Sequence, residues 1–227
     1  MRSNKVRIKD LGRRPFAEAW KIQQEIHAET IADELHEHTL LFCEHPHVYT
    51  LGKSGRDANL LVGEDLLAEK GIDLFRIDRG GDITYHGPGQ VVCYPIFDLS
   101  ALNIGVRKYI GLLEEAVIGT LREYGLKGER MKGATGVWLD PSLPAGARKI
   151  CAIGVKVSRS VTMHGLAFNV ATHLEYFGYI NPCGFTDKTV TSMEKELDKN
   201  PEPEEVKVLL AQKIGEVFNL EVFDEDP

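Results

Sequence analysis

Two neighbouring runs of alternating residues constrain the fold of this chain most strongly. They span residues 149–157 and 161–170, and only the short polar segment from Ser158 to Ser160 separates them. Such a pair predicts a β-hairpin, in which consecutive strands run antiparallel. A chain organised around hairpins favours an α+β fold with a largely antiparallel sheet over a βαβ nucleotide-binding fold.

The rest of the chain predicts further strands and three long helices. Apolar residues recur at helical spacing after Pro15, from residue 105 to 124, and after Pro203, and Gly125 stands just past the second of these segments. Strand-like runs fall at residues 6–8, 39–43, 48–51, 73–78, 91–99, 136–139 and 220–223, with a short helix at 64–70. We therefore predict a single α+β domain over residues 1–227, with a mixed, largely antiparallel sheet flanked by helices.

Charge and hydropathy exclude several classes of partner. The 227 residues carry 34 acidic and 27 basic side chains, a formal net charge of −7. This balance gives no general attraction to nucleic acid or anionic lipid. The longest apolar stretch, from Val91 to Phe97, is far shorter than the ~18 residues of a membrane-spanning helix, and no signal-peptide core follows the N-terminus. We expect a cytoplasmic protein that binds neither nucleic acid nor membrane.

The cysteines differ in their surroundings. No Cys-x-x-Cys pair occurs among Cys43, Cys93, Cys151 and Cys183, so free thiols are expected rather than disulfides or a zinc knuckle. Cys43 and Cys93 lie in apolar runs typical of buried strands. Cys183 stands between a proline and a glycine, in a tight turn that would expose its sulfur.

Lys149 heads the first strand of the hairpin, and period-two alternation predicts that it shares a face with Cys151 and Ile153. Two interpretations remain open. The charge reaches solvent at the strand end while the stem packs, or the amine is partly desolvated and held charged by an anion such as a thiolate. A thiolate beside an ammonium is a usable nucleophile near neutral pH, and Cys183 and Cys151 are the rival thiols.

Four glycines fall among the twelve residues from Arg79 to Gln90. Glycine permits positive φ and lets a ligand approach the main chain closely. The segment is either a long hairpin loop or a binding site, and the interleaved Thr84, Tyr85 and His86 favour a site. It is neither a Walker loop nor a dinucleotide fingerprint, because no Gly-Lys-Ser/Thr ends it and no helix follows it.

Histidines gather at His36, His38, His45 and His47. No carboxylate or thiol completes a recognised ligand set with them, so no metal is expected. His164 shares a strand face with Leu166 and is expected to point inward.

Five groups of residues follow one another in a fixed order. They are Glu44-His45-Pro46 with Tyr49-Thr50-Leu51-Gly52, the segment from Arg79 to Gln90, Arg148-Lys149-Ile150 with Ala152-Ile153-Gly154-Val155, His164-Gly165-Leu166-Ala167 with Asn169, and Pro182-Cys183-Gly184 with Val190-Thr191-Ser192. Over about residues 35–195 the chain thus closely resembles the lipoyl (octanoyl) transferase family.

The resemblance implies a fold shared with biotin and lipoate protein ligases and a single catalytic acyltransferase domain. The implied reaction moves an octanoyl group from octanoyl-acyl carrier protein to a lysine of lipoyl-bearing domains, those of 2-oxoacid dehydrogenase complexes and the glycine cleavage H protein. By position, Cys183 matches the acyl-thioester nucleophile and Lys149 the residue that lowers its pKa. The implied substrate-binding residues are Arg79, Gly80, Gly81, Asp82, Ile83, Thr84, Tyr85, His86, Ala152, Ile153, Gly154, Gly165, Leu166 and Ala167.

No cofactor is expected, because exchange between thioesters is nearly balanced and amide formation is downhill. We expect Ile83, Ile153 and Leu166 to line the acyl slot and Tyr85 and His86 to close its mouth. A basic rim of Arg79, Arg148 and Lys149, with Arg56 or Arg107 as further candidates, would meet the acidic carrier.

Three alternative functions remain. An ATP-dependent lipoate or biotin protein ligase would need no nucleophilic cysteine. An octanoyl amidotransferase between lipoyl-bearing proteins would differ only in its donor. A non-catalytic acyl-binding module would retain its ligand without a covalent adduct.

Overall fold

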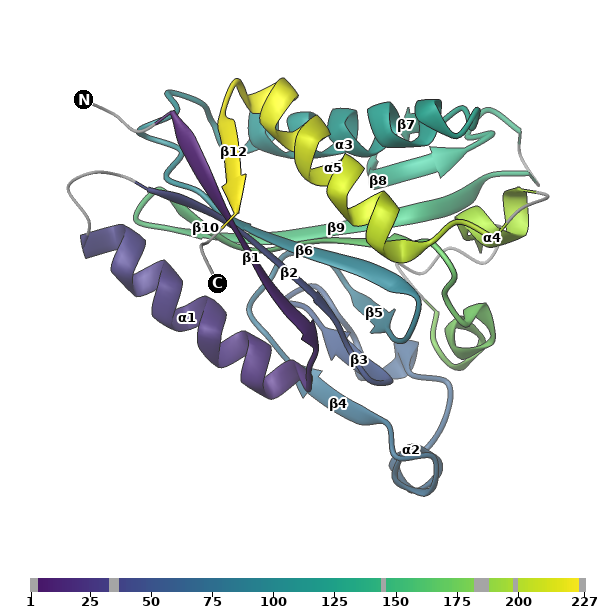
Figure 1. The fold of residues 1–227 in the computed structure, drawn as a ribbon. Coiled ribbons are helices and arrows are strands. Elements are labelled where there is room, and N and C mark those ends of the chain that lie inside the picture. The colour runs from purple at the N-terminus through teal and green to yellow at the C-terminus, as the bar shows by residue number, and fades with distance from the viewer. Residues whose placement is uncertain (1–3, 33–36, 144–145, 182–187, 198–199, 225–227) are drawn as a thin grey trace.

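The computed structural model describes residues 4–32, 37–143, 146–181, 188–197 and 200–224 (Figure 1). The strands of the main sheet lie in a spatial order that differs from their order in the sequence. That order is β12 (Glu221–Asp224), β1 (Lys5–Arg13), β2 (His38–Glu44), β6 (Gln90–Ile96), β10 (Val161–Asn169), β9 (Arg148–Ser158), β8 (Ala134–Leu139) and β7 (Glu129–Met131). The short strand β11 (Thr189–Val190) adds to the start of β9.

Helices cover both faces of this sheet. α3 (Val106–Glu123) and α5 (Pro203–Phe218) lie together on one face, and α1 (Phe16–Ala32) lies on the other, as Figure 1 shows. On α3, Tyr109, Leu113, Val117 and Leu121 are fully buried at helical spacing. Each such side chain contributes roughly 1.5–3 kcal/mol through burial, which fixes the helix on the sheet.

A second, smaller sheet packs below the main one. It consists of β4 (Asp73–Arg76), β3 (Val48–Leu51) and β5 (Ile83–His86), in the spatial order β4-β3-β5. The remaining elements are short: the 3₁₀ turns η1 (Asp57–Asn59) and η2 (Leu174–Tyr179) and the helices α2 (Glu64–Glu69) and α4 (Met193–Glu196). No helix of the described residues is long and apolar enough to cross a membrane.

The predicted fold class is confirmed. β9 and β10 form the expected hairpin, in which Val161 pairs with Ser158 and the two connecting residues Arg159 and Ser160 have φ values of 50° and 67°. Positive φ at both central residues is the geometry of a type I′ turn. The pairs β1–β2, β1–β12, β3–β4 and β9–β11 are parallel, and the other strand pairs are antiparallel.

The segment from Arg79 to Gln90 is not one continuous loop. Its second half forms β5, where Thr84 pairs with Thr50 and Tyr85 with Tyr49 of β3. Ile83 and Tyr85 point into an apolar cluster with Tyr49 and Leu51. Four residues are too few for the alternation to stand out among the glycines, so the strand was not predicted.

A β-bulge near the start of β9 corrects the predicted orientation of Lys149. Val137 of β8 pairs with Cys151, but the next residue, Trp138, pairs with Lys149, so Ile150 is an extra residue on β9. Ile150 and Cys151 consequently both pack into the main core with Val137. Lys149 instead lies on the side of Trp138, with its Nζ 4.7 Å from the ring centroid. The expected shared face of Lys149 and Cys151 is therefore wrong, because a bulge reverses the alternation.

Candidate active site

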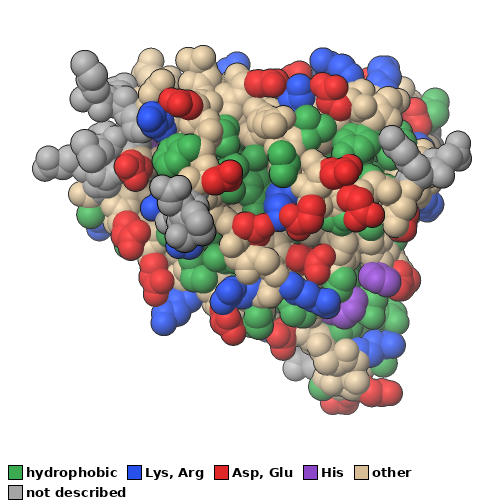
Figure 2. All heavy atoms as spheres, viewed as in Figure 1, with side chains coloured by type: hydrophobic (Ala, Val, Ile, Leu, Met, Phe, Trp, Pro, Cys, Tyr) green, Lys and Arg blue, Asp and Glu red, His purple; other side chains and the backbone are tan. Residues whose placement is uncertain are grey.

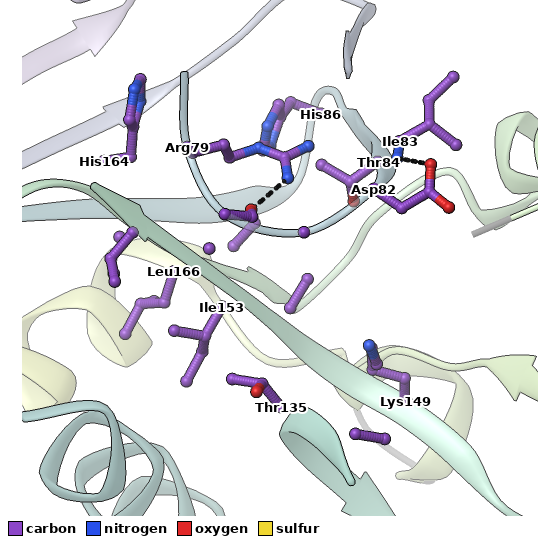
Figure 3. A pocket seen from close by; sticks show the side chains of 18 of the residues that line it. Arg79, Asp82, Ile83, Thr84, His86, Thr135, Lys149, Ile153, His164 and Leu166 are labelled. Carbon is purple, nitrogen blue, oxygen red and sulfur yellow. Dashed lines mark hydrogen bonds between the residues drawn. The ribbon is translucent and has the colours of Figure 1, made fainter. Parts of the chain in front are cut away.

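A cavity of about 530 Å³ is lined by the small sheet, by strands β8, β9 and β10 of the main sheet and by the start of α3. Figure 3 shows Ile153 and Leu166 on the main-sheet side, Arg79 and Thr84 across from them, and Lys149 at one end. Among the described residues, the predicted substrate-binding set lines this cavity with one exception, Tyr85. The lining members are Arg79, Gly80, Gly81, Asp82, Ile83, Thr84, His86, Ala152, Ile153, Gly154, Gly165, Leu166 and Ala167, together with Lys149.

Tyr85 does not line the cavity, because its side chain lies deeper in the apolar cluster of the small sheet, with Tyr49. Its hydroxyl lies 2.7 Å from His47 Nδ1, and its ring stacks on Tyr176 at a centroid distance of 5.2 Å. His86 lines the cavity, but it is buried and bonded to Gln90 and Thr50. Neither side chain stands where the expected mouth closure would require it.

Arg79 fixes the glycine-rich turn from the inside. Its Nη2 donates to the Thr50 carbonyl at 2.7 Å and to Thr50 Oγ1 at 3.0 Å, and its Nη1 donates to the Gly80 carbonyl at 3.0 Å. Only 7% of Arg79 is exposed. The guanidinium is thus a buried organiser of the main chain, and its predicted place on a basic rim is wrong.

Arg148 is also committed to other groups. It forms a bidentate pair with Glu196, with Nε–Oε1 and Nη2–Oε2 distances of 2.8 and 3.0 Å, and its Nη2 lies 2.9 Å from Asp140. Paired charges contribute little field to an approaching partner. On the face in Figure 2, basic side chains are interspersed with acidic ones rather than gathered in a patch. Arg148 is therefore not part of a basic rim as predicted.

Close backbone contact joins the two sheets at the cavity. The Gly80 N–H donates to the carbonyl of Val155 at 2.9 Å. A Cβ at Gly154 would lie 2.8 Å from the Gly80 oxygen and 3.1 Å from Arg79 Cδ. The absence of a side chain at Gly154 is thus what lets the turn reach β9.

Lys149 lies at one end of the cavity, beside β11. Val190 of β11 pairs with Lys149, and Lys188, Thr189 and Val190 line the cavity beside it. The ring of Trp138 under the ammonium favours the charged amine through a cation–π contact. Cys183 itself lies outside the described residues.

The described thiols are poor nucleophiles. Cys43, Cys93 and Cys151 are at most 5% exposed, and burial raises the pKa of each of them. Because Cys151 faces the core rather than Lys149, the structure removes it as the rival thiol at this site.

Three buried histidines around the cavity are neutral. Burial lowers the pKa of His45 to about 4, of His86 to about 3 and of His164 to about 4. His45 Nδ1 lies 2.8 Å from the Arg14 carbonyl and must donate to it, so Nε2 accepts from the Tyr94 hydroxyl at 2.7 Å. His47 instead stacks on Tyr176, so His45 and His47 lie in different surroundings. No group of three or more metal-ligating side chains occurs in the described part of the chain.

Sequence reasoning missed several residues of the site. Trp138, Thr135, Gln90, Asn169, Phe16 and Tyr94 also line the cavity. Gln90 and Asn169 belong to the motifs that resemble the transferase family, which was a usable signal. Trp138 carried none, because its contact with Lys149 depends on the bulge at Ile150.

The fold and this cavity define a class of protein. Residues 15–215 match the family model of the lipoyl protein ligase A/B catalytic domain, and the chain belongs to this family. Curated relatives named octanoyltransferase include those of Parabacteroides distasonis and Bacteroides thetaiotaomicron. Both are 52% identical, over 93% and 90% of this chain and 98% and 92% of their own lengths.

Solved structures share the fold. A bi-partite lipoate protein ligase from Thermoplasma acidophilum superposes with a TM-score of 0.74 at 18% identity, covering 99% of this chain and 87% of that one. A biotin protein ligase from Aquifex aeolicus gives a TM-score of 0.55 at 11% identity, covering 94% and 70%. The expected biotin and lipoate protein ligase-like architecture is thereby confirmed.

A methyl group should have opposite effects at two glycines. We expect Gly154→Ala to destabilise the protein by about 1–3 kcal/mol, because the new Cβ meets the Gly80 carbonyl. Gly111→Ala on α3 should stabilise it by up to about 1 kcal/mol, because its Cβ would enter open space in a helix. Denaturant unfolding of both variants tests this, and equal effects would contradict the close contact.

Acid should destabilise the protein through His45, His86 and His164. Their folded pKa values lie below the ordinary 6.5, so the unfolded chain binds more protons once the pH falls below 6.5. The stability they contribute is present above pH 6.5 and is lost as the pH falls, by about 1.4 kcal/mol per pH unit and histidine. Unfolding free energies between pH 7 and 5 measure this slope. His45→Gln should reduce it and His173→Gln, at an exposed site, should not; a level profile in the parent protein would refute the assignment.

Proposed function

We propose that this protein is an octanoyltransferase. It moves an octanoyl group from octanoyl-acyl carrier protein to a lysine of lipoyl-bearing domains, those of 2-oxoacid dehydrogenase complexes and the glycine cleavage H protein, through a thioester on Cys183. The observation that carries the proposal is the single cavity in which Lys149 meets the described acyl-binding segments. Relatives named octanoyltransferase that match nearly the whole chain support it.

The cavity suits a fatty thioester. Ile153 and Leu166 supply apolar surface along it, Ile83 borders it on the small sheet, and Lys149 supplies a cation at one end. An apolar slot with few polar groups is the usual form of a small-molecule site. In the sequence, Cys183 precedes the cavity-lining Lys188 by five residues, and the proposal assigns its thiol to the Lys149 end of the slot.

Lys149 can balance the protons of both steps. The Cys183 thiolate attacks the carrier thioester, a new C–S bond forms, and the carrier thiolate leaves with a proton from the Lys149 ammonium. The acceptor lysine then attacks the acyl-enzyme, the neutral Lys149 amine takes its proton, and the bond to Cys183 breaks. The products are an amide and a free carrier thiol, the thiolate and ammonium are restored, and no nucleotide is consumed.

Incubation with octanoyl-acyl carrier protein should add one octanoyl group to the intact protein. We expect Cys183→Ser to abolish this gain of mass and Cys151→Ala to retain it, because Cys151 is buried against the core. Mass spectrometry of the intact proteins provides the measurement. Turnover that survives in Cys183→Ser and requires ATP would instead establish a ligase.

Lys149→Ala should shift the alkylation of Cys183 to higher pH, because the thiolate loses the cation that stabilises it. The rate of iodoacetamide labelling against pH reports this thiol selectively, since Cys43, Cys93 and Cys151 are buried. Lys53→Ala, which removes a lysine outside the cavity lining, is the control. An unchanged profile in Lys149→Ala would remove its role.

A further inference from the structure

A buried chain of side-chain hydrogen bonds runs from the glycine-rich turn to the strand beside Lys149. Each of its members is at most 7% exposed. The bonds are Arg79 Nη2 to Thr50 Oγ1 at 3.0 Å, Thr50 Oγ1 to His86 Nε2 at 3.3 Å, His86 Nδ1 to Gln90 Oε1 at 2.8 Å, Gln90 Nε2 to Asn169 Oδ1 at 2.9 Å, and Asn169 Nδ2 to the Thr191 carbonyl at 3.0 Å.

The two ends fix the direction of every bond in this chain. The guanidinium of Arg79 can only donate, and the Thr191 carbonyl can only accept. Between these ends, the Thr50 hydroxyl therefore donates to His86 Nε2, and the protonated Nδ1 of His86 donates onward to Gln90. One tautomer of His86 and one orientation of each amide satisfy the whole chain, so it behaves as a single cooperative unit.

Thr191 connects this chain of hydrogen bonds to Lys149. Its N–H donates to the Lys149 carbonyl at 2.9 Å, and its hydroxyl donates to Glu196 Oε1 at 2.5 Å. Glu196 is the carboxylate that forms the bidentate ion pair with Arg148. The N–H, the hydroxyl and the carbonyl of Thr191 are thus all hydrogen-bonded. The N–H bonds to Lys149, and the hydroxyl reaches Arg148 through Glu196.

We propose that Asn169 is a positioning residue, which holds Thr191, and through it Lys149, in a fixed position relative to the glycine-rich turn. This inference rests on the proposed roles of Lys149 and Cys183. Asn169 is suited to the task because it pairs with Gln90 across β10 and β6 and carries both an acceptor and a donor. Its side chain lines the cavity wall and bonds to Gln90 and Thr191, so it acts on Lys149 through Thr191.

Two substitutions remove the N–H that Asn169 donates to Thr191, one with an added charge and one without. Asn169→Asp keeps the shape and loses the N–H that serves Thr191, and Asn169→Val loses both bonds without adding charge. We expect both variants to lower kcat by roughly 10- to 100-fold with little change in KM for the octanoyl donor, because misplacement weakens catalysis more than binding. Both should also raise the alkylation midpoint of Cys183 by about one pH unit, because the ammonium is displaced from the thiolate.

Val117→Ala is the matched control for lost stability. Val117 is fully buried on α3, outside the chain of bonds, so this variant should lower the unfolding midpoint while the alkylation profile stays as in the parent protein. The inference is overturned if both Asn169 variants keep the parent profile, if only the charged variant shifts it, or if Val117→Ala shifts it equally.

The alkylation experiment separates this inference from the proposed function. It needs no donor or acceptor, only the folded protein. If the parent protein takes up no octanoyl group, or Lys149→Ala leaves alkylation unchanged, the proposed function fails. If both of those experiments succeed and the Asn169 variants match the parent, the positioning role alone fails.

Discussion

The site depends on one hydrogen bond between the two sheets, from the Gly80 N–H to the carbonyl of Val155. β8 pairs with β9 only between residues 148 and 151, so Val155 lies on a stretch of β9 beyond that ladder. The glycine-rich turn occupies this edge in place of a further strand. A turn satisfies the edge carbonyl without covering the face of the sheet, and the space left beside it is the cavity.

Placing the turn there requires small residues on both sides. Gly154 removes a side chain that would strike the Gly80 oxygen, and Gly52 removes one that would lie 2.4 Å from the Gly81 oxygen. Arg79 then donates to the carbonyl groups of Thr50 and Gly80. The glycines of this segment therefore serve close packing of main chains, and the arginine within it serves hydrogen bonding rather than attraction of a partner.

Much of this architecture could be predicted because it follows from local patterns. The β9–β10 hairpin, the three long helices and the edge strand β12 each have a periodicity or a turn that identifies them within about twenty residues. The residues expected to bind the acyl group were predicted from the resemblance alone, and most of them line one cavity. The face of Lys149 was not predictable, because the bulge at Ile150 depends on how β8 meets β9. The burial of Arg79 was also hidden, since its partners come from β3, a separate segment of the chain.

Non-local contacts also build the buried polar network around His86. Burial keeps His86 neutral, and its two nitrogens have opposite roles set by Thr50 and Gln90. A second proton on this ring would face the Thr50 hydroxyl, whose own hydrogen would then need another acceptor. Protonation would thus break the bond that Thr50 donates to His86, which adds to the cost of charging this buried ring. A network that resists titration in this way keeps its geometry, and in the proposed two-step transfer it leaves the exchange of protons to Lys149.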